Sequence, residues 1–369
     1  MLDYSSSMNL AFSLLLVLLI VYNIYRFYYW IIYPYYLGPY KNVPRVQNGL
    51  VHYMKLYYHR LLGSPNYYLQ LSNDHGPVVH LVKNWVLVND PILKKLWSNY
   101  QFPKSYSYRV FNIYGPNIFS SFDKDFHNFR KKMILPSFTK KNLKYNKDIY
   151  TIGSQNLVDM FKDKISQGQS NIFDLYHYFE CSALDVITTL SIGHSLNTVR
   201  DETMSKEFFK VWTHTQYVLF LKGLIPSIST INVPTVERYK YLIEQSVKYR
   251  QSENIQFDDT LQSLMDGQDP QTGENLTLTE IIEEFFIILY AGLDTTSNTM
   301  TWTLYEILKN PKLYNLIKQE ILNNFPDLTK PINLSDCEAK LVHLEAAIWE
   351  SLRMHSVVET FARRVPEGG

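Results

Sequence analysis

A short segment near residue 290 combines residues that could move protons with residues that leave space. Ala291 and Gly292 are followed by Leu293, Asp294 and Thr295 inside a run that is otherwise apolar. The carboxyl and hydroxyl groups could supply protons to a bound molecule, and the small pair would let a flat body approach the backbone closely. In a structural alternative, the hydroxyls bond back to carbonyls of the preceding helical turn. This segment alone is consistent with both interpretations.

A long, mostly buried helix is predicted to carry this segment, from Thr277 to Pro311. Thr277 and Glu280 have the spacing of a capping box at a helix start. Apolar residues then recur at helical spacing on both sides of the segment, and Asn310 with Pro311 ends the helix. Glycine inside a helix costs on the order of 1 kcal/mol relative to alanine. Gly292 therefore requires a reason in packing or in function.

A second motif, Glu350-x-x-Arg353, lies on a predicted amphipathic helix that runs from Leu341 to Arg353. At i and i+3 the two side chains share one helix face and can pair. Such a pair alone is worth only about 0.2–0.5 kcal/mol on a solvated helix. The motif gains meaning only in combination with the segment near residue 290.

Taken together, the two motifs resemble the oxygen-activating central helix and the Glu-x-x-Arg helix of the cytochrome P-450 family of heme-thiolate monooxygenases. The resemblance implies a mainly α fold with a small β-sheet region, that is, a partial cytochrome P-450 fold behind an N-terminal transmembrane helix. It also implies insertion of one O2-derived oxygen atom into a small organic, lipophilic substrate. The implied cofactor is heme b, an iron protoporphyrin, and the implied electron source is NADPH through a reductase partner.

The resemblance assigns roles to residues of both motifs. Asp294 and Thr295 would relay protons to the iron-bound oxygen, and Ala291 and Gly292 would leave room for it. Glu350 and Arg353 would form a structural pair that supports folding.

Arginines on either side of the central helix are implied to bind heme propionates. Arg130 stands one helical turn after Phe126, in the place of the family's Trp-x-x-x-Arg motif, with phenylalanine where the family has the indole donor. Arg363 or Arg364 would supply a second cationic contact. The sequence leaves open which of the two faces the heme, and the alternative for all three is a solvent-exposed basic turn.

The family's proximal iron ligand is a cysteine in a Phe- and Gly-rich loop downstream of Glu-x-x-Arg. The sequence ends at Gly369 before such a loop, and neither Cys181 nor Cys337 has one around it. The prediction is therefore a chain truncated before the heme-ligand loop, with no metal ligand of its own and inactive as given. The alternatives are a non-catalytic membrane-anchored fragment or pseudoenzyme with a binding or regulatory role, and an unrelated membrane-tethered helical protein.

The N-terminal segment predicts a membrane anchor. No charge occurs between Asp3 and Arg26, and the apolar run is long enough for a somewhat short membrane helix. Aromatic residues cluster after it, as they do at a membrane interface, and basic residues follow. These features favour a single pass in the endoplasmic reticulum membrane with the catalytic body in the cytosol. The alternative is a hydrophobic hairpin buried in a soluble core.

The predicted organisation has three parts. Residues 1–33 form the anchor and its aromatic interface, residues 34–50 a hinge that contains proline and glycine, and residues 51–369 an incomplete catalytic domain. Within the last part, Pro77–Pro91 alternates apolar and polar residues around Lys83 and Asn84, which predicts a β-hairpin.

Composition excludes several other function classes. The chain has 369 residues with 46% hydrophobic and 15% aromatic content, ample for a large core. A net charge of +1 without a basic face argues against a nucleic-acid partner. The 2 cysteines are too few for a disulfide framework. None of the histidines has the spacing of a metallohydrolase motif.

Overall fold

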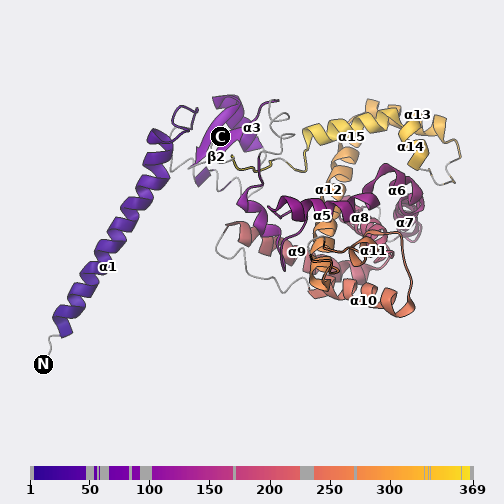
Figure 1. Ribbon diagram of the computed structural model, residues 1–369. Coiled ribbons are helices and arrows are strands. Elements are labelled where there is room, and N and C mark those ends of the chain that lie inside the picture. Colours follow the sequence, from indigo (N-terminus) through magenta and orange to yellow (C-terminus); the bar gives the residue numbers. More distant parts are fainter. Residues whose placement is uncertain are drawn as a thin grey trace. The chain divides into compact units, whose positions relative to one another are not determined.

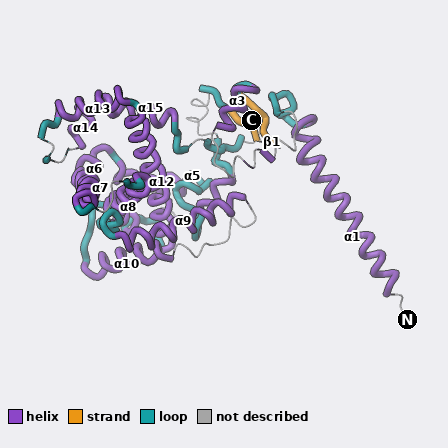
Figure 2. The backbone as a smooth tube through the Cα atoms, turned by 180° about the vertical axis from the view of Figure 1, so that it is seen from behind, coloured by secondary structure: helices purple, strands orange, loops and turns teal. Residues whose placement is uncertain are grey.

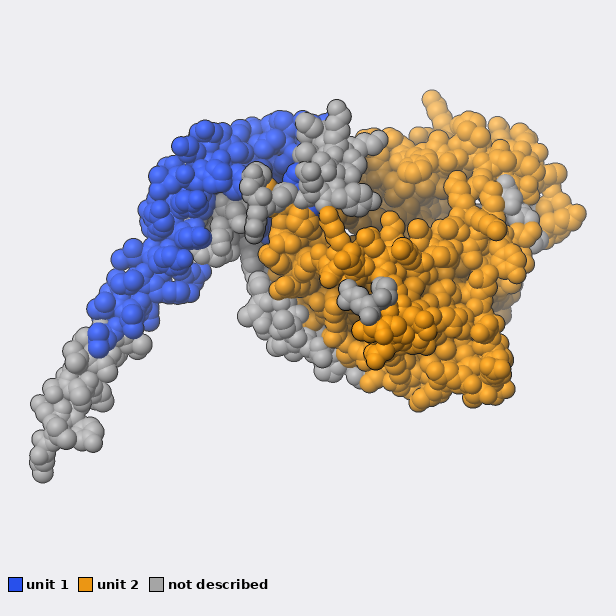
Figure 3. Space-filling model, in the orientation of Figure 1, with its two compact units in different colours: residues 1–102, 366–369 blue, residues 103–365 orange. Residues whose placement is uncertain are grey.

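The computed structural model describes residues 4–46, 54, 55, 58, 66–82, 85–91, 102–168, 172–224, 237–269, 272–327, 329, 330, 332, 334–358 and 360–365. These residues form two compact units. The first comprises Met1–Phe102 with Pro366–Gly369, and the second comprises Pro103–Val365 (Figure 3).

The first unit begins with one long apolar helix. Helix α1 (Tyr4–Phe27) continues into a π-helical segment, η1 (Tyr28–Leu37), which contains Pro34. Leu16–Pro34 is long and apolar enough to cross a membrane, and the described side chains from Leu16 to Tyr29 are exposed. A helix that finds no protein partner for its apolar side chains is what a membrane span requires, because lipid takes the place of the core. The helical backbone extends four residues into the predicted hinge, from Pro34 to Leu37.

The first unit also contains the small sheet. Helix α3 (Asn66–His75) precedes strands β1 (Val78–Val82) and β2 (Trp85–Val88), which pair antiparallel with Val78 opposite Val88. The predicted hairpin is therefore confirmed in its strands, while its turn lies outside the described residues. Val79 and Leu81 point into a small apolar cluster with Leu71 of α3, in keeping with the alternation of side chains along a strand.

The second unit is helical (Figures 1 and 2). Two isolated bridges are its only strand-like pairings among the described residues, and one of them joins Lys104 to Arg363. With the sheet of the first unit, this confirms the predicted fold class. The helices, including the 3-10 segments η2 and η3, are η2 (Tyr106–Phe111), α5 (Lys124–Ile134), η3 (Leu135–Phe138), α6 (Lys140–Tyr145), α7 (Lys147–Ser166), α8 (Leu175–Ile192), α9 (Glu202–Leu224), α10 (Glu237–Glu253), α11 (Thr260–Met265), α12 (Leu278–Lys309), α13 (Pro311–Asn324), α14 (Leu334–Lys340) and α15 (Val342–Met354).

Helix α12 is the centre of the second unit's packing. Its predicted start is confirmed, because Thr277 and Glu280 cap each other reciprocally. Asn310 ends it and caps α13, which begins at Pro311. The N-terminal half of α12 is buried in the main apolar cluster, α8 packs along it, and α10, α11, α13 and α15 also contact it. The segment near residue 290 therefore lies on the helix around which the other helices of the unit pack.

Candidate functional site

The middle of α12 carries the small residue and the hydroxyl expected for a ligand-binding face. Ala291 is exposed, and Thr295 one turn later is half-buried. The Thr295 hydroxyl donates to the Ala291 carbonyl at 2.6 Å, and Ser297, Thr299 and Thr301 likewise bond back one turn. The helix stays α-helical throughout, so back-bonding does not break it. Each hydroxyl oxygen keeps acceptor capacity for a further donor.

Gly292 has a packing explanation. A Cβ built on this glycine would come within 2.9 Å of Cγ1 of Ile187 on α8, which is too close for an unadjusted contact. The absence of a side chain therefore lets α8 lie against α12. Of the predicted small pair, Ala291 is the residue that is exposed and Gly292 the one that packs against α8. A contact between Gly292 and heme stays a prediction.

Asp294 points towards α9. Its two carboxyl oxygens accept hydrogen bonds from Nε1 of Trp212 at 3.1 Å and from Nε2 of Gln216 at 2.8 Å. Burial raises the pKa of Asp294, and the two hydrogen bonds act in the opposite direction because they favour the charged form. Asp294 and Thr295 are adjacent in sequence, yet Asp294 is bonded to α9 and Thr295 to its own helix.

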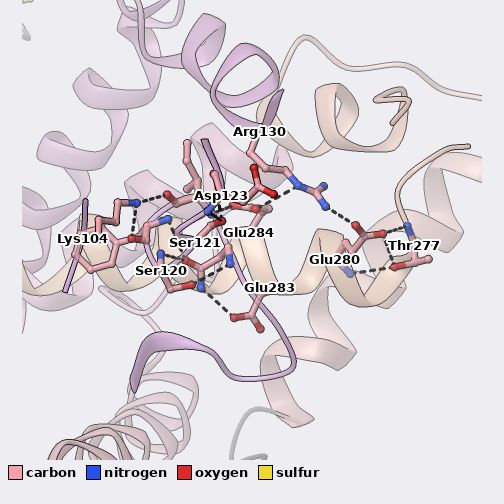
Figure 4. A network of polar contacts seen from close by, with 12 residues as sticks. Lys104, Ser120, Ser121, Asp123, Arg130, Thr277, Glu280, Glu283 and Glu284 are labelled. Carbon is pink, nitrogen blue, oxygen red and sulfur yellow. Dashed lines mark hydrogen bonds and ion pairs between the residues drawn. The ribbon is translucent and has the colours of Figure 1, made fainter. Parts of the chain in front are cut away.

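Arg130 lies in a buried charged cluster with the first turns of α12 (Figure 4). Its side chain is 2% exposed, forms an ion pair with Glu280, and places Nε 3.5 Å from Oε1 of Glu284. The Phe126 and Phe129 rings lie 4.7 and 5.5 Å from its guanidinium carbon. Burial raises the pKa of Glu284 to about 7, against the lowering effects of the Ile118 amide and Arg130. The nearest charges to Arg130 are thus carboxylates of its own chain.

Glu283, which the sequence did not single out, holds the segment before α5. Its carboxylate accepts hydrogen bonds from the amides of Ile113 at 3.0 Å and Tyr114 at 2.8 Å and from Nδ2 of Asn117 at 2.9 Å. Glu284 similarly accepts from the amide of Ile118 at 3.0 Å. A signal was available, because three glutamates within five residues are unusual in a helix turn flanked by apolar residues.

The lysines Lys104 and Lys222 hold the same segment through its carbonyls. Nζ of Lys222 donates to the Asn112 carbonyl at 2.8 Å. Nζ of Lys104 donates to the Ile118 carbonyl at 3.0 Å and the Phe119 carbonyl at 2.7 Å. Residues 112–119 are therefore bound from one side by carboxylates and from the other by ammonium groups.

Arg363 and Arg364 lie beside Lys104. The amide of Arg364 donates to the Pro103 carbonyl at 2.8 Å, which helps to pair residues 362–364 with residues 103–105. Nη1 of Arg363 donates to the Tyr108 hydroxyl at 3.0 Å. Nε and Nη1 of Arg364 donate to the Lys104 carbonyl at 2.9 Å and the Tyr106 hydroxyl at 2.6 Å.

Positive groups gather around Lys104. Burial, and then the charge of Arg363, lowers the pKa of Lys104 to about 8. Burial, and then the charge of Lys104, lowers the pKa of His127, and Lys131 adds to the effect. Lys104, Lys131 and Arg363 therefore form a cationic cluster beside His127, whose lowered pKa favours the neutral ring, and an anion would stabilise this cluster. The sequence pointed to Arg363 but missed Lys104 and His127, because their proximity depends on the fold.

The Glu350–Arg353 pair forms as predicted, with Arg353 donating to both carboxyl oxygens at 2.8 and 2.6 Å. Both side chains are more than half exposed. Solvent screens such a pair, so it contributes little stability.

Neither cysteine offers a thiolate. Cys181 is fully buried, and burial raises its thiol pKa to about 11 despite contacts to Ser205 at 3.3 Å and His177 at 3.7 Å. Burial also raises the pKa of Cys337. Among the described residues, no group of three or more His, Cys, Asp or Glu side chains could hold a metal ion.

Comparisons with known proteins agree on one family. The sequence profile of the cytochrome P450 family matches residues 62–368. A cytochrome P450 monooxygenase of a Fusarium species is 27% identical over 77% of this chain and 58% of its own length. Pisatin demethylase of Fusarium vanettenii is 24% identical over 82% of this chain and 62% of its own length. A crystal structure of a cytochrome P450 superposes with a TM-score of 0.67 at 19% identity, covering 81% of this chain and 66% of that one.

The chain thus spans a little over half the length of these two curated relatives. The family profile nevertheless matches most of the chain, and the superposition shows the same fold. The central helix with its Ala291, Asp294 and Thr295, the Glu350–Arg353 pair and the cationic cluster all lie within the matched residues. The chain belongs to the cytochrome P450 family.

Proposed function

We propose that the protein inserts one O2-derived oxygen atom into an organic, lipophilic substrate at a bound heme. The observation that carries this proposal is the arrangement on α12, where exposed Ala291 leaves space beside Thr295 and Asp294 is buried next to it. Bound heme supplies the iron at which oxygen is activated, a reaction that protein side chains cannot perform alone. The remaining contributions come from the chain's own residues.

The donor set of the cationic cluster fits the propionates of heme b. Lys104 and Arg363 are half-buried and positively charged, and, after burial, the charge of Arg363 is one of the causes that lower the pKa of Lys104, so an anion there would offset this repulsion. We assign the second arginine contact, left open by the sequence, to Arg363, because its charge acts on Lys104. Arg130 stays a proposed propionate ligand, since its buried Nε and Nη1 have no hydrogen-bond partner among the described residues, and Lys104 joins it.

Proton handling is assigned to Thr295 and Asp294. The Thr295 hydroxyl lies one turn after exposed Ala291 and donates its one hydrogen to the Ala291 carbonyl. It can therefore accept a hydrogen bond from a bound molecule, and it can donate to that molecule once it releases the carbonyl. Trp212 and Gln216 of α9 donate hydrogen bonds to the carboxyl group of Asp294 and so fix its orientation. Asp294 directly precedes Thr295 on α12.

The iron ligand is not assigned to Cys181 or Cys337, because a thiol with a raised pKa is a poor source of thiolate. This observation also favours a second candidate function, a binding or regulatory role for the polypeptide as given. The two candidates differ in one spectrum: a polypeptide of this sequence, mixed with heme, reduced and exposed to carbon monoxide, should lack the spectrum of thiolate-ligated heme. Its appearance would show that one of the two cysteines ligates iron.

The proposed setting is the endoplasmic reticulum membrane. Residues 1–33 would anchor the protein, 34–50 would form the hinge and 51–369 would belong to the catalytic domain, facing the cytosol and a reductase that delivers electrons from NADPH. The exposed apolar helix α1 supports this proposal. Removal of residues 1–33 should release the protein from microsomal membranes into the soluble fraction; retention would argue against the anchor.

Heme binding itself tests the propionate assignment. Titration of the purified chain with heme, followed by absorbance, should show weaker binding for Lys104→Gln and Arg363→Gln than for Lys132→Gln, an exposed lysine of α5. Equal binding by all three would reject the assignment. In a form that turns over, Thr295→Ala should raise the share of oxygen consumed without product, and unchanged coupling would remove Thr295 from the proton relay.

A further inference from the structure

One amide side chain lies in the apolar part of helix α1. From Leu14 to Ile24 the sequence is aliphatic except for Tyr22 and Asn23. Leu16–Pro34 is the stretch that is long and apolar enough to cross a membrane, and Asn23 lies seven residues after its start. At 1.5 Å of rise per residue, Asn23 is about 10 Å from that end of the span. Its side chain therefore lies among lipid tails when this stretch crosses a bilayer.

The Asn23 amide is only partly satisfied by its own helix. Nδ2 donates to the Leu19 carbonyl at 2.7 Å, and the side chain is exposed. An asparagine amide has two N–H bonds and an acceptor oxygen. Among the described residues, the second N–H bond and Oδ1 of Asn23 have no partner. Lipid tails offer neither donors nor acceptors, so this part of the amide is costly to place in a bilayer.

A second copy of α1 supplies the missing partner. An asparagine is complementary to itself, because the remaining N–H of one amide can donate to Oδ1 of the other. Asparagines hydrogen-bond across helices in membranes, and one asparagine in an apolar seam sets the register of two paired helices. No Asp, Glu, Lys or Arg occurs from Tyr4 to Tyr25, so like charges do not oppose two parallel helices over this length. The guanidinium of Arg26 lies over the Tyr22 ring, about a quarter of a turn around the helix from Asn23.

The helix face around Asn23 is free to pack against such a copy. At 100° per residue, Leu16, Leu19 and Phe27 lie within about 40° of Asn23 around the helix. Their side chains are 52%, 55% and 55% exposed, so the described part of the protein does not cover them. The spacing of these four residues, at i, i+3, i+7 and i+11, is that of a seam between two helices. The face thus places the amide in the middle of an apolar contact.

We propose that α1 is a dimerisation element, in which two copies of the protein pair in parallel in the membrane through Leu16, Leu19, Asn23 and Phe27. The two Asn23 amides bond to each other at the centre of the contact. This inference rests on the membrane setting of the proposed function and adds a partner, a second copy of this chain. It requires neither heme nor turnover.

Energy transfer between tagged copies of the full chain tests the dimer. One population carries a donor and the other an acceptor fluorescent protein at the C-terminus, and both are reconstituted into phosphatidylcholine vesicles. Asn23→Leu removes the amide and keeps the helix apolar, so it should raise the dimer dissociation constant about 3–30-fold. Asn23→Gln retains an amide and should keep most of the transfer. Tyr25→Leu, on the opposite side of α1, is the matched control and should leave the constant unchanged; equal constants in wild type and Asn23→Leu would overturn the proposal.

Cysteine cross-linking identifies the face that makes the contact. In a Cys337→Ser background, Leu16→Cys should give a disulfide-linked dimer when the vesicles are mildly oxidised. Leu18→Cys, two residues further along and on the far side of the helix from Asn23, should remain monomeric. Cys181 is fully buried and does not take part. Equal cross-linking at both positions would reject the proposed face.

Vesicle flotation separates this inference from the proposed membrane setting. Wild type that does not float with the vesicles would reject the anchor and, with it, the dimer. Wild type that floats but shows no energy transfer would reject the dimer alone and leave the anchor in place. Flotation together with transfer that Asn23→Leu weakens would support both.

Discussion

Replacing Glu283 by alanine should destabilise the protein by about 2–4 kcal/mol. The carboxylate accepts hydrogen bonds from the amides of Ile113 and Tyr114 and from the side-chain amide of Asn117. Ile113 and Asn117 are essentially inaccessible to water, so in the variant the Ile113 amide loses this acceptor and Asn117 Nδ2 keeps only its bond to the Phe111 carbonyl. A buried donor that loses its acceptor costs about 1–3 kcal/mol. Removal of a buried charge recovers part of this, since burial raises the pKa of Glu283 and thus opposes its ionised form.

Urea denaturation of wild type and variant measures the difference directly, as a shift of the midpoint at unchanged slope. Amide hydrogen exchange gives the local readout, because the amides of Ile113 and Tyr114 should lose protection before those of α8 do. Glu350→Ala is the matched control: its carboxylate has two close hydrogen bonds as well, but in solvent, and its removal should leave the midpoint unchanged. The reasoning fails if Glu283→Ala is no less stable than Glu350→Ala.

Arg130→Ala should lower the free energy of unfolding by about 3–5 kcal/mol, because it leaves the Glu284 charge buried without its partner. Adding Glu284→Gln should recover part of this loss in urea denaturation; no recovery would contradict the pairing. Alone, Glu284→Gln should reduce the pH dependence of stability: the pKa of this carboxyl rises from 4.5 to about 7 on folding, so its contribution is full below pH 4.5 and is lost as the pH rises through 7. Denaturation midpoints at pH 5 and pH 8 should therefore differ less than in wild type. Gly292→Ala should cost about 1–3 kcal/mol through overpacking against Ile187. Ile187→Ala relieves that clash, so strictly additive losses in the double variant would contradict the packing explanation.

Local sequence signals were sufficient to predict α12 and its boundaries. The Thr277–Glu280 capping box and the Asn310-Pro311 stop act within a single turn of chain, and the apolar spacing between them needs no knowledge of distant residues. The strands of the hairpin were predictable for the same reason, because alternation and pairing are confined to Val78–Val88.

Partners far apart in the sequence were not predictable in this way. The carboxylates that pair with Arg130, on Glu280 and Glu284, lie about 150 residues later in the sequence. Lys104 meets Arg363 only because residues 103–105 pair with residues 362–364. Local sequence patterns carry no information about such pairings. A single sequence also gives no other indication of which distant residues lie close together in the fold. The pairing of Glu350 with Arg353, by contrast, was predictable, since helix spacing at i and i+3 fixes which side chains meet.

Glu283 and Glu284 at the start of α12 are buried carboxylates, and their hydrogen-bond partners indicate what this costly burial achieves. Glu283 and Glu284 bind the amides of residues 113, 114 and 118, and the carbonyls of residues 118 and 119 bind Lys104. Lys104 in turn lies against Arg363 in the cationic cluster. The helix that carries Asp294 and Thr295 is therefore linked, through one buried segment, to the cations proposed to hold the heme. A carboxylate does this better than a neutral acceptor, because bonds to charged groups are shorter and stronger and so fix the segment more tightly.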